Sequence, residues 1–351
     1  MLLLENIALA PLTTIKIGGP ARYFVEARNV GEAQEAVTFA RSRDLPLFVL
    51  GGGSNLVVAD AGWLGLVLKI AVPDIEQRSG HDEDGNVVFD AGAGESWDKF
   101  VSHAVMARCA GVECLSGIPG SVGGTPVQNV GAYGQEVAET IASVQVLDLK
   151  DNRVRELCPE ACEFSYRTSI FNTSERGRFV VLRVTYALTP NGNPHITYTD
   201  LKRHFEGRET PPNLAETREA VRHIRALKGM LIVPGDPDSQ SAGSFFKNPV
   251  LSEAQHEDLK RRAAARGLTV PSYPALETRK KVSAAWLVER SGFAKGFGFE
   301  RVGISTRHAL AIVNRGGATA AEVVALKEQI QQRVEEIWGV RLEPEPVMVG
   351  F

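Results

Sequence analysis

Two glycine-rich segments restrict the fold of this chain more than any other feature. The first, Gly51–Asn55, directly follows the apolar run Leu45–Leu50, and the second, Gly117–Gly134, holds six glycines and two prolines in eighteen residues. Glycines after an apolar strand let consecutive backbone N–H groups converge on an anion such as a pyrophosphate. The first segment alone is equally consistent with a tight turn. The two together, about sixty residues apart, predict one extended phosphorylated cofactor.

The first segment does not match the common nucleotide-binding motifs. Gly51 and Gly53 give G-x-G, but Leu56 stands where the dinucleotide fingerprint has its third glycine. The P-loop motif G-x4-G-K-[ST] is also missing from the sequence. Neither a Rossmann dinucleotide site nor a P-loop is therefore expected.

Around these segments the sequence predicts alternating strands and helices. A strand at 22–27, a helix capped by Asn29 with Glu32, and a strand at 45–50 indicate a βαβ unit that ends on the first glycine segment. Composition changes near 189–194 and 210–213 indicate a domain boundary. Further expected elements are a hairpin turn at 79–86, a helix at 97–107, strands within 144–188, and helices at 216–228, after Ser252 and after Thr319.

Composition and charge exclude several functional classes. Lys and Arg number 39 against 42 Asp and Glu, and the resulting net charge of −3 argues against a general nucleic-acid binder. No run approaches the roughly 18 apolar residues of a membrane span. Residues 1–15 lack the basic region and cleavage site of a signal peptide. We therefore expect a cytoplasmic protein with no nucleic-acid partner and no membrane insertion.

The cysteines and histidines do not predict a metal site. The four cysteines, at positions 109, 114, 158 and 162, have spacings that match no common zinc pattern. His256-Glu257 begins like the HExxH motif, but Lys260 stands where its second histidine belongs. We expect free thiols in a reducing compartment and no bound metal.

The order of several longer motifs resembles the UDP-N-acetylenolpyruvoylglucosamine reductase family. The motifs are T-T-I-K-I-G-G-P-A-R at 13–22, the first glycine segment, I-P-G-S-V-G-G at 118–124, N-V-G-A-Y-G at 129–134, S-Y-R-T-S-I-F at 165–171, A-G-S-F-F-K-N-P at 242–249, S-A-A-W-L-V-E at 283–289 and L-E-P-E at 342–345. They cover nearly the whole chain. The resemblance implies a flavoenzyme that uses FAD and NADPH to reduce UDP-N-acetylglucosamine enolpyruvate to UDP-N-acetylmuramate for bacterial peptidoglycan.

The resemblance also implies a fold. The expected class is α+β, with a two-part FAD-binding region of the vanillyl-alcohol-oxidase type and a smaller α+β substrate domain. The expected boundaries are 1–72 for the first FAD-binding subdomain, 73–212 for the second with a tyrosine loop, 213–330 for the substrate domain, and 331–351 for a C-terminal segment that returns to the active site. A monomer is expected.

The resemblance assigns roles to individual residues. Arg167 matches the catalytic arginine, Ser244 the serine proton donor and Glu345 the catalytic glutamate. Substrate contacts are expected from Tyr198 in the mobile loop of the longer family variant, and from Lys228 and Asn248. The expected cofactor-binding residues are Gly51, Gly52, Gly53, Ser54, Asn55, Gly117, Pro119, Gly120, Ser121, Gly123, Gly124, Asn129 and Gly131. Taken singly, most of these have ordinary structural interpretations, and only the ordered set of motifs favours the functional one.

The chemistry of the reaction requires these residue types. Hydride delivery to C3 of the enol ether leaves negative charge spread from C2 into the carboxylate, which a fixed guanidinium stabilises. C2 then takes a proton, and a serine hydroxyl held in line can supply it because an enolate carbon is a strong base. Glu345 can stabilise the enol by a hydrogen bond or tune the protonation of its partner, and the sequence leaves both roles open.

Some features depart from the family pattern, and two other functions compete. Pro346 follows Glu345 where the family more often has valine, Glu343 offers a second carboxylate, and Lys228 lies sixteen residues before Ser244, more than in some members. The competing functions are a related flavin oxidase that acts on a small alcohol or hydroxy acid, and a nucleotide-binding module without catalysis. The combination of Ser244, Arg167 and Glu345 favours enolate protonation over oxidation of an alcohol, whereas the module without catalysis would be recognised by a protein that stays colourless after refolding with FAD.

Overall fold

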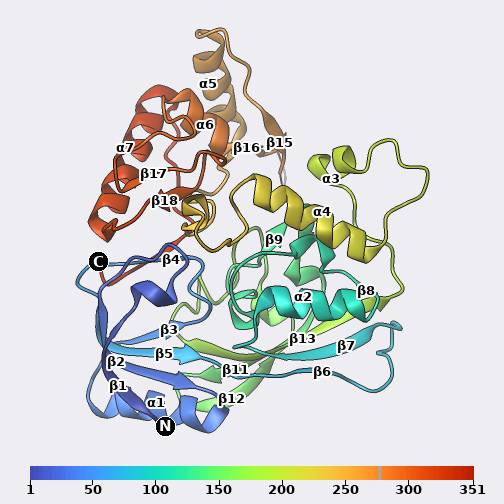
Figure 1. The fold of residues 1–351 in the computed structure, drawn as a ribbon, viewed down its shortest axis with the longest axis vertical. Helices are drawn as coiled ribbons and strands as arrows, with labels where there is room; N and C mark the ends of the chain where they lie inside the picture. Colours follow the sequence, from blue (N-terminus) through green and yellow to red (C-terminus); the bar gives the residue numbers. More distant parts are fainter. Residues whose placement is uncertain (276–277) are drawn as a thin grey trace. The chain divides into compact units, whose positions relative to one another are not determined.

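The computed structural model describes residues 1–275 and 278–351, which divide into two compact units (Figure 1). Unit 1 comprises Met1–Ile7, Ala21–Gly53 and Trp63–Leu227. Unit 2 comprises Ala8–Pro20, Ser54–Gly62 and Lys228–Phe351. Both units therefore contain sequence-distant segments. The four-part division expected from the sequence cuts the chain at other points and stays a prediction about domains.

A four-stranded sheet of order β1-β2-β5-β3 begins unit 1 (Figure 1). Its strands are β1 (Leu3–Ala8), β2 (Pro20–Ala27), β5 (Trp63–Ile70) and β3 (Leu47–Leu50), and both β2 and β3 run parallel to β5. Helix α1 (Val30–Ser42) joins β2 to β3, and the Asn29 side chain accepts a hydrogen bond from the Glu32 amide. The expected βαβ unit and its cap are confirmed.

The second sheet of unit 1 is antiparallel, with the order β12-β11-β13-β7-β6 and β8 beside β13. Its strands are β6 (Ile75–Gln77), β7 (Val87–Gly92), β8 (Cys109–Ala110), β11 (Ile141–Asp148), β12 (Arg153–Leu157) and β13 (Phe179–Pro190). The pairing of β6 with β7 confirms the expected hairpin. Helix α2 (Trp97–Met106) packs its Phe100 on Tyr186 of β13, with ring centroids 4.5 Å apart.

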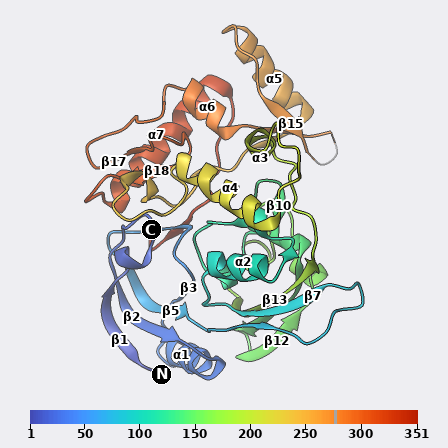
Figure 2. The same cartoon turned by 45° about the vertical axis from the view of Figure 1, so that its right-hand side comes forward.

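Unit 1 also contains the helices α3 (Thr199–His204) and α4 (Leu214–Leu227), and Figure 2 shows α4 beside α2. Arg218 and Arg222 of α4 form ion pairs with Asp98 of α2. Helix α4 confirms the helix expected at 216–228. The ion pairs with Asp98 hold this helix in unit 1. The strands β9 (Gly131–Ala132) and β10 (Gln135–Glu136) form a small ladder in the second glycine segment.

The 3₁₀ turns of unit 1 lie mostly around the second glycine segment. They are η2 (Glu113–Leu115), η3 (Val122–Gly124), η4 (Val137–Glu139) and, further along the chain, η5 (Glu160–Cys162). Of these turns, η3 lies inside the segment, and η2 and η4 flank it.

Unit 2 packs three main helices around small sheets. The helices are α5 (Glu253–Ala264), α6 (Ala284–Arg290) and α7 (Ala320–Trp338), with the short turns η1 (Ala10–Leu12) and η6 (Pro237–Ser239). The strands are β4 (Leu56–Val58), β14 (Val250–Leu251), β15 (Ser272–Pro274), β16 (Lys280–Val282), β17 (Val302–Ile304), β18 (Ile312–Asn314) and β19 (Val347–Val349). Capping boxes at Ser252 and Thr319 confirm the expected starts of α5 and α7.

The C-terminal strand of unit 2 pairs with a segment from the N-terminal part of the chain. Strand β19 runs parallel to β4, with Val347 opposite Leu56 and Val349 opposite Val58. Asp60, two residues beyond β4, accepts hydrogen bonds from the amides of Ala320 and Ala321 at the start of α7. Residues 54–62, which begin with the last two residues of the first glycine segment, are thereby fixed in unit 2.

Candidate functional site

Within unit 1, the two glycine segments lie directly against each other. A Cβ atom added to Gly52 would lie 2.5 Å from Cα of Gly120 and 2.6 Å from the amide nitrogen of Ser121. One added to Gly51 would lie 3.0 Å from Oγ of Ser121. No side chain fits between two backbones at this distance, so only glycine is compatible with position 52. The prediction that the segments act together is consistent with this contact.

Ser121 carries a buried hydroxyl that has no hydrogen-bond partner among the described residues. A buried unpaired hydroxyl costs free energy unless a ligand or water completes it. Gly117 and Gly120 on the same segment have φ values of 70° and 132°, a region that favours glycine. An unsatisfied donor on a glycine-lined stretch of main chain fits a phosphorylated group such as FAD, which these residues would hold.

Anchors from α2 and α4 hold the start of the second glycine segment. The Gly117 amide donates to Oδ1 of Asp98 at 2.6 Å, and the Gly117 carbonyl accepts from Nε of Arg225 at 3.1 Å. Further along, the hydroxyls of Thr125 and Tyr186 are hydrogen-bonded at 2.7 Å. Both sides of the Gly117 peptide are thereby fixed by charged side chains, which sequence reasoning did not identify.

Asp98 is the centre of this anchor. It accepts from Arg218 at 2.6 and 2.9 Å and from Arg222 at 2.7 Å, in addition to Gly117. Burial alone would raise the pKa of Asp98, but the hydrogen bonds from Arg218 and Gly117 and the nearby positive charge hold the pKa below its ordinary value. Asp98 is therefore a carboxylate at neutral pH. Burial lowers the pKa of Arg225, but a guanidinium stays protonated in proteins.

The Arg167 guanidinium binds the backbone near the C-terminal end of the second glycine segment. Its Nη2 donates to the Gly131 carbonyl at 2.6 Å and its Nη1 to the Asn129 carbonyl at 3.4 Å. Asn129 uses its side chain within the segment, since its Nδ2 donates to Glu136 and its Oδ1 accepts from the Ala138 amide. These bonds indicate that Asn129 shapes the loop.

Three residues here have left-handed backbones although none is glycine. The φ values are 43° for Asn129, 50° for Tyr133 and 58° for Arg167. Such conformations cost energy for residues with a Cβ atom, and strained residues concentrate at functional sites. Because the conformation depends on tertiary contacts, the sequence could not reveal it.

The loop that carries Tyr198 is anchored to the second glycine segment. The Tyr198 ring contacts Tyr133 edge to face, with centroids 5.4 Å apart, and is 45% exposed. Upstream, the His195 amide donates to Oε1 of Glu113, a fully buried carboxylate that also accepts from Gln135. Tyr198 is therefore a partly exposed phenol on a loop whose backbone is held by these contacts.

In unit 2, Ser244 and Glu345 lie on chain segments that are hydrogen-bonded to each other. The Glu345 amide donates to the Phe245 carbonyl at 2.9 Å, and Phe246 forms a bridge with Pro344. Ser244 is half-buried, next to the fully buried Phe245. Glu343, the other candidate glutamate, has a 78% exposed side chain. The Glu345 backbone is therefore paired with the segment that carries Ser244, and the choice of Glu345 over Glu343 stays a prediction.

Asn55 has a partner that sequence reasoning missed. Its Nδ2 donates to the Glu345 carbonyl at 3.2 Å, and its own carbonyl accepts from the Val347 amide at 2.9 Å. Pro346 donates no backbone hydrogen bond, and the pairing of β19 with β4 begins after it at Val347. The substitution of proline for valine is therefore compatible with the strand pairing.

The remaining expected residues have local positions. Lys228 begins the last of the three segments of unit 2, directly after α4. Oδ1 of Asn248 accepts from the Ala284 amide at the start of α6. Arg167 and Tyr198 belong to unit 1, whereas Ser244, Glu345, Lys228, Asn248, Ser54 and Asn55 belong to unit 2.

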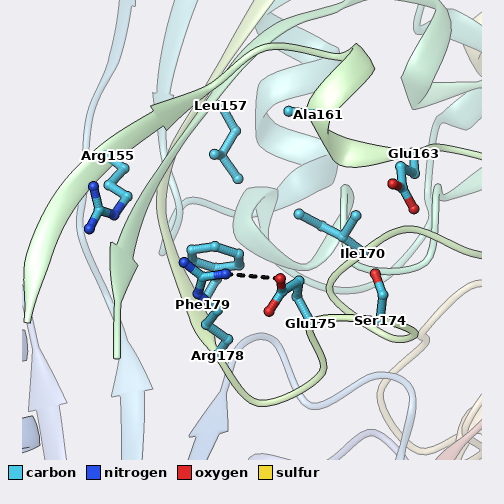
Figure 3. Close-up of a pocket in the computed structure, with 9 residues that line it drawn as sticks. All are labelled: Arg155, Leu157, Ala161, Glu163, Ile170, Ser174, Glu175, Arg178 and Phe179. Atoms are coloured by element: carbon cyan, nitrogen blue, oxygen red, sulfur yellow. Dashed lines mark hydrogen bonds and ion pairs between the residues drawn. The ribbon is translucent and has the colours of Figure 1, made fainter. Parts of the chain in front are cut away.

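A hollow elsewhere in unit 1 contains none of these residues. It has a volume of about 350 Å³ and is lined by residues of β12, η5 and the loop before β13 (Figure 3). Two of its charged residues, Arg178 and Glu175, form an ion pair at 2.9 Å.

The structure also bears on metals, thiols and membranes. All four cysteines are free, as expected, and three of them are buried. Over the described ranges 1–275 and 278–351, no group of three or more His, Cys, Asp or Glu side chains could hold a metal ion. In the same ranges, every helix is too short or too polar to cross a bilayer.

Two family models match the chain. Residues 236–349 match the UDP-N-acetylenolpyruvoylglucosamine reductase C-terminal domain, and residues 21–157 match an FAD binding domain. The chain is 45% identical to the UDP-N-acetylenolpyruvoylglucosamine reductase of Thermobifida fusca, over 99% of this chain and 98% of that protein. It is 43% identical to the protein of the same name from Streptomyces avermitilis, over 99% and 95% of the two chains.

A solved structure is similar over its whole length. The crystal structure of UDP-N-acetylenolpyruvylglucosamine reductase from Thermus caldophilus has a TM-score of 0.66 and 26% identity, and it covers 99% of this chain and all of that one. Together with the FAD-binding match, it confirms the expected α+β class with an FAD-binding region.

Proposed function

Because the chain belongs to the UDP-N-acetylenolpyruvoylglucosamine reductase family and is an FAD-dependent oxidoreductase, we propose that Ser244, Arg167 and Glu345 carry the reaction on UDP-N-acetylglucosamine enolpyruvate. The product is UDP-N-acetylmuramate, a peptidoglycan precursor. The observation that carries the proposal is the hydrogen-bonded pairing of the segments that bear Ser244 and Glu345, inside the matched C-terminal domain. NADPH as reductant, a cytoplasmic location and a monomeric state remain predictions.

When bound, FAD would supply the redox chemistry, which is hydride transfer from NADPH to C3 of the substrate. The glycine segments at 51–55 and 117–131 would hold FAD, with Ser121 as a hydrogen-bond donor. Backbone N–H groups and a hydroxyl suit the cofactor's phosphates because they offer donors at short range without a mobile counter-charge.

Arg167 stabilises the charge that develops on the substrate. When C3 gains hydride, negative charge spreads from C2 into the carboxylate, and a planar guanidinium offers two parallel donors to that group. Its bonds to the carbonyls of Asn129 and Gly131 hold the guanidinium in place before the substrate arrives. Such preorganisation means that little reorganisation is needed as the charge forms.

Ser244 supplies the proton. Its Oγ–H bond breaks as the new C2–H bond forms, and the alkoxide is reprotonated through water or a neighbouring group. Glu345 has one of the two roles that the sequence left open. It either donates or accepts a hydrogen bond at the enol, or it controls the protonation of the group with which it interacts. Tyr198, Lys228 and Asn248 bind the UDP part of the substrate, since a phenol, an ammonium and an amide match diphosphate and uracil.

Ser244→Ala tests the assignment by separating the two half-reactions. We expect normal FAD binding and normal reduction by NADPH, but loss of the second half-reaction by orders of magnitude in stopped-flow measurements. Ser42→Ala is the control, because its hydroxyl bonds locally at the end of α1. Reoxidation of Ser244→Ala by substrate at the wild-type rate would refute the role of Ser244.

A further inference from the structure

Ser244 lies between two fixed points of the chain. On its C-terminal side, the Phe245 amide donates to the Leu310 carbonyl at 2.7 Å, and the Phe245 side chain is fully buried. On its N-terminal side, Ser241 is buried and bridges to Val313 of β18. The direction of the Ser244 side chain is therefore set by how residues 241–243 are held.

This short connection has little internal restraint. Gly243 has φ of 80°, and a Cβ atom added to it would meet nothing within 4 Å. The only side-chain bond inside the turn that the described residues provide is a long one, from the Gly243 amide to Oγ of Ser241 at 3.3 Å. Because glycine has wide backbone freedom, an external anchor on Ser241 determines where Ser244 points.

Thr14 provides that anchor from the N-terminal part of the chain. Its Oγ1 lies 2.6 Å from the Ser241 carbonyl and 3.4 Å from the Ser54 carbonyl. A hydroxyl has one proton, so the shorter bond to Ser241 dominates. All three residues belong to unit 2.

The turn that carries Thr14 is itself rigid. Ile15 and Ile17 are buried in the core of unit 2, and Nδ2 of the buried Asn314 donates to the carbonyls of Ile15 and Lys16. The Asn314 amide in turn donates to the Gln240 carbonyl at 2.9 Å, next to Ser241. The hydrogen bond from Thr14 thus ties the segment that precedes Ser244 to a fixed turn.

We propose that Thr14 is a positioning residue for proton delivery, whose hydroxyl fixes the Ser241 carbonyl and thereby aims the Ser244 hydroxyl at the substrate carbon. The inference rests on the proposed role of Ser244. Thr14 touches neither substrate nor cofactor in this account. Since a misplacement of about 1 Å at a reacting group costs on the order of 100-fold in rate, loss of the bond affects the protonation step selectively.

Thr14→Val and Thr14→Ser form the matched pair of variants. Valine keeps the shape of the side chain and removes the hydroxyl, whereas serine keeps the hydroxyl. In anaerobic stopped-flow experiments on the holoenzyme, we expect Thr14→Val to reduce the rate of flavin reoxidation by enolpyruvyl substrate roughly 10- to 100-fold. Reduction by NADPH stays within about twofold, and Thr14→Ser restores reoxidation to within about threefold. Amide exchange in the peptide covering 241–245 becomes faster in Thr14→Val only.

Thr13→Val controls for a general structural effect. Among the described residues, the Thr13 hydroxyl bonds inside the same turn, to the carbonyls of Ala10 and Ile17. We expect this variant to lower thermal stability without a selective loss of reoxidation. An equal loss of reoxidation in Thr13→Val and Thr14→Val would overturn the proposal.

A double-mutant cycle separates this proposal from the one on which it rests. If Thr14 acts through Ser244, Thr14→Val causes no further loss in a Ser244→Ala background. If the losses in reoxidation rate from the two substitutions multiply in the double variant, the positioning role is refuted. It is also refuted if Thr14→Val is reoxidised normally while Ser244→Ala is defective, and in both cases the proposed function stands. Normal reoxidation in Ser244→Ala would refute the proposed function itself, and the inference with it.

Discussion

Ser121→Ala is expected to change the stability of the ligand-free protein and its affinity for FAD in opposite senses. The Ser121 hydroxyl is buried with no hydrogen-bond partner among the described residues. Removing it relieves the cost of an unsatisfied polar group, whereas in the FAD complex the same change removes a hydrogen bond. An ordinary structural serine does not behave in this way.

The magnitudes follow from the burial and from the charge of the ligand. An unsatisfied buried hydroxyl costs roughly 1–3 kcal/mol, so the variant apoprotein gains about 1 kcal/mol after the small lost contact is allowed for. For a unit of this size that raises Tm by roughly 2–4 °C. A hydrogen bond to a charged phosphate oxygen contributes about 1.5–3 kcal/mol, so Kd for FAD rises roughly 10- to 150-fold.

The assay uses apoprotein in two parallel measurements. Thermal unfolding gives the stability without ligand, and quenching of FAD fluorescence gives the affinity. Ser116→Ala is the matched control, because its buried hydroxyl donates to the Glu113 carbonyl at 2.6 Å and is already satisfied. Its loss should lower Tm of the apoprotein. A lower Tm for Ser121→Ala, or unchanged FAD affinity, would refute the assignment of Ser121 to the cofactor.

Further substitutions test the glycine contact, its anchor and the arginine. Gly52→Ala places a Cβ atom 2.5 Å from the Gly120 backbone, so we expect roughly 1–3 kcal/mol of strain and weaker FAD binding; unchanged affinity by fluorescence titration would contradict the contact. The pKa of Asp98 is depressed, so its contribution to stability is complete above its unfolded-state pKa and is lost as pH falls through its folded-state pKa. Asp98→Asn should therefore lower Tm at pH 7. The difference in Tm between wild type and variant should become smaller below about pH 4, and a difference that does not change with pH would refute the contribution of the Asp98 charge. Arg167→Lys should bind FAD but lose most of the second half-reaction, because an ammonium cannot reproduce the planar pair of donors, and a wild-type rate of reoxidation would place the substrate carboxylate elsewhere.

Local signals in the sequence predicted local structure well. The starts of α1, α5 and α7 follow Asn29, Ser252 and Thr319, because an N-cap needs only a side chain and an amide three residues later. The hairpin between β6 and β7 also depends on adjacent residues. In each case the atoms that interact lie within a few residues of one another.

Contacts between distant segments could not be predicted in the same way. The bond from Asn55 to Glu345 spans 290 residues, and the one from Thr14 to Ser241 spans 227. The TPPN sequence before α4 indicated a boundary, yet Arg218 pairs with Asp98, 120 residues earlier, and keeps α4 with unit 1. Such pairings depend on the folded positions of both partners, and a single sequence carries no record of them.

The motifs identified the candidate residues but not how they are supported. Asn55 was expected at the cofactor, and the structure shows that its amide also bonds to the Glu345 backbone. The left-handed backbone of Arg167 has no signature in S-Y-R-T-S. Support of this kind arises from tertiary packing, whereas a motif identifies only the residue that is supported.

Anaerobic single turnover of the purified holoenzyme tests the central claim most directly. The FAD-bound protein is reduced with one equivalent of NADPH, and one equivalent of UDP-N-acetylglucosamine enolpyruvate is then added without oxygen. The account predicts that the oxidised flavin spectrum returns and that one equivalent of UDP-N-acetylmuramate is formed. Flavin that stays reduced with this substrate, but is rapidly reoxidised by air after reduction by a small alcohol or hydroxy acid, would contradict the account and favour an oxidase.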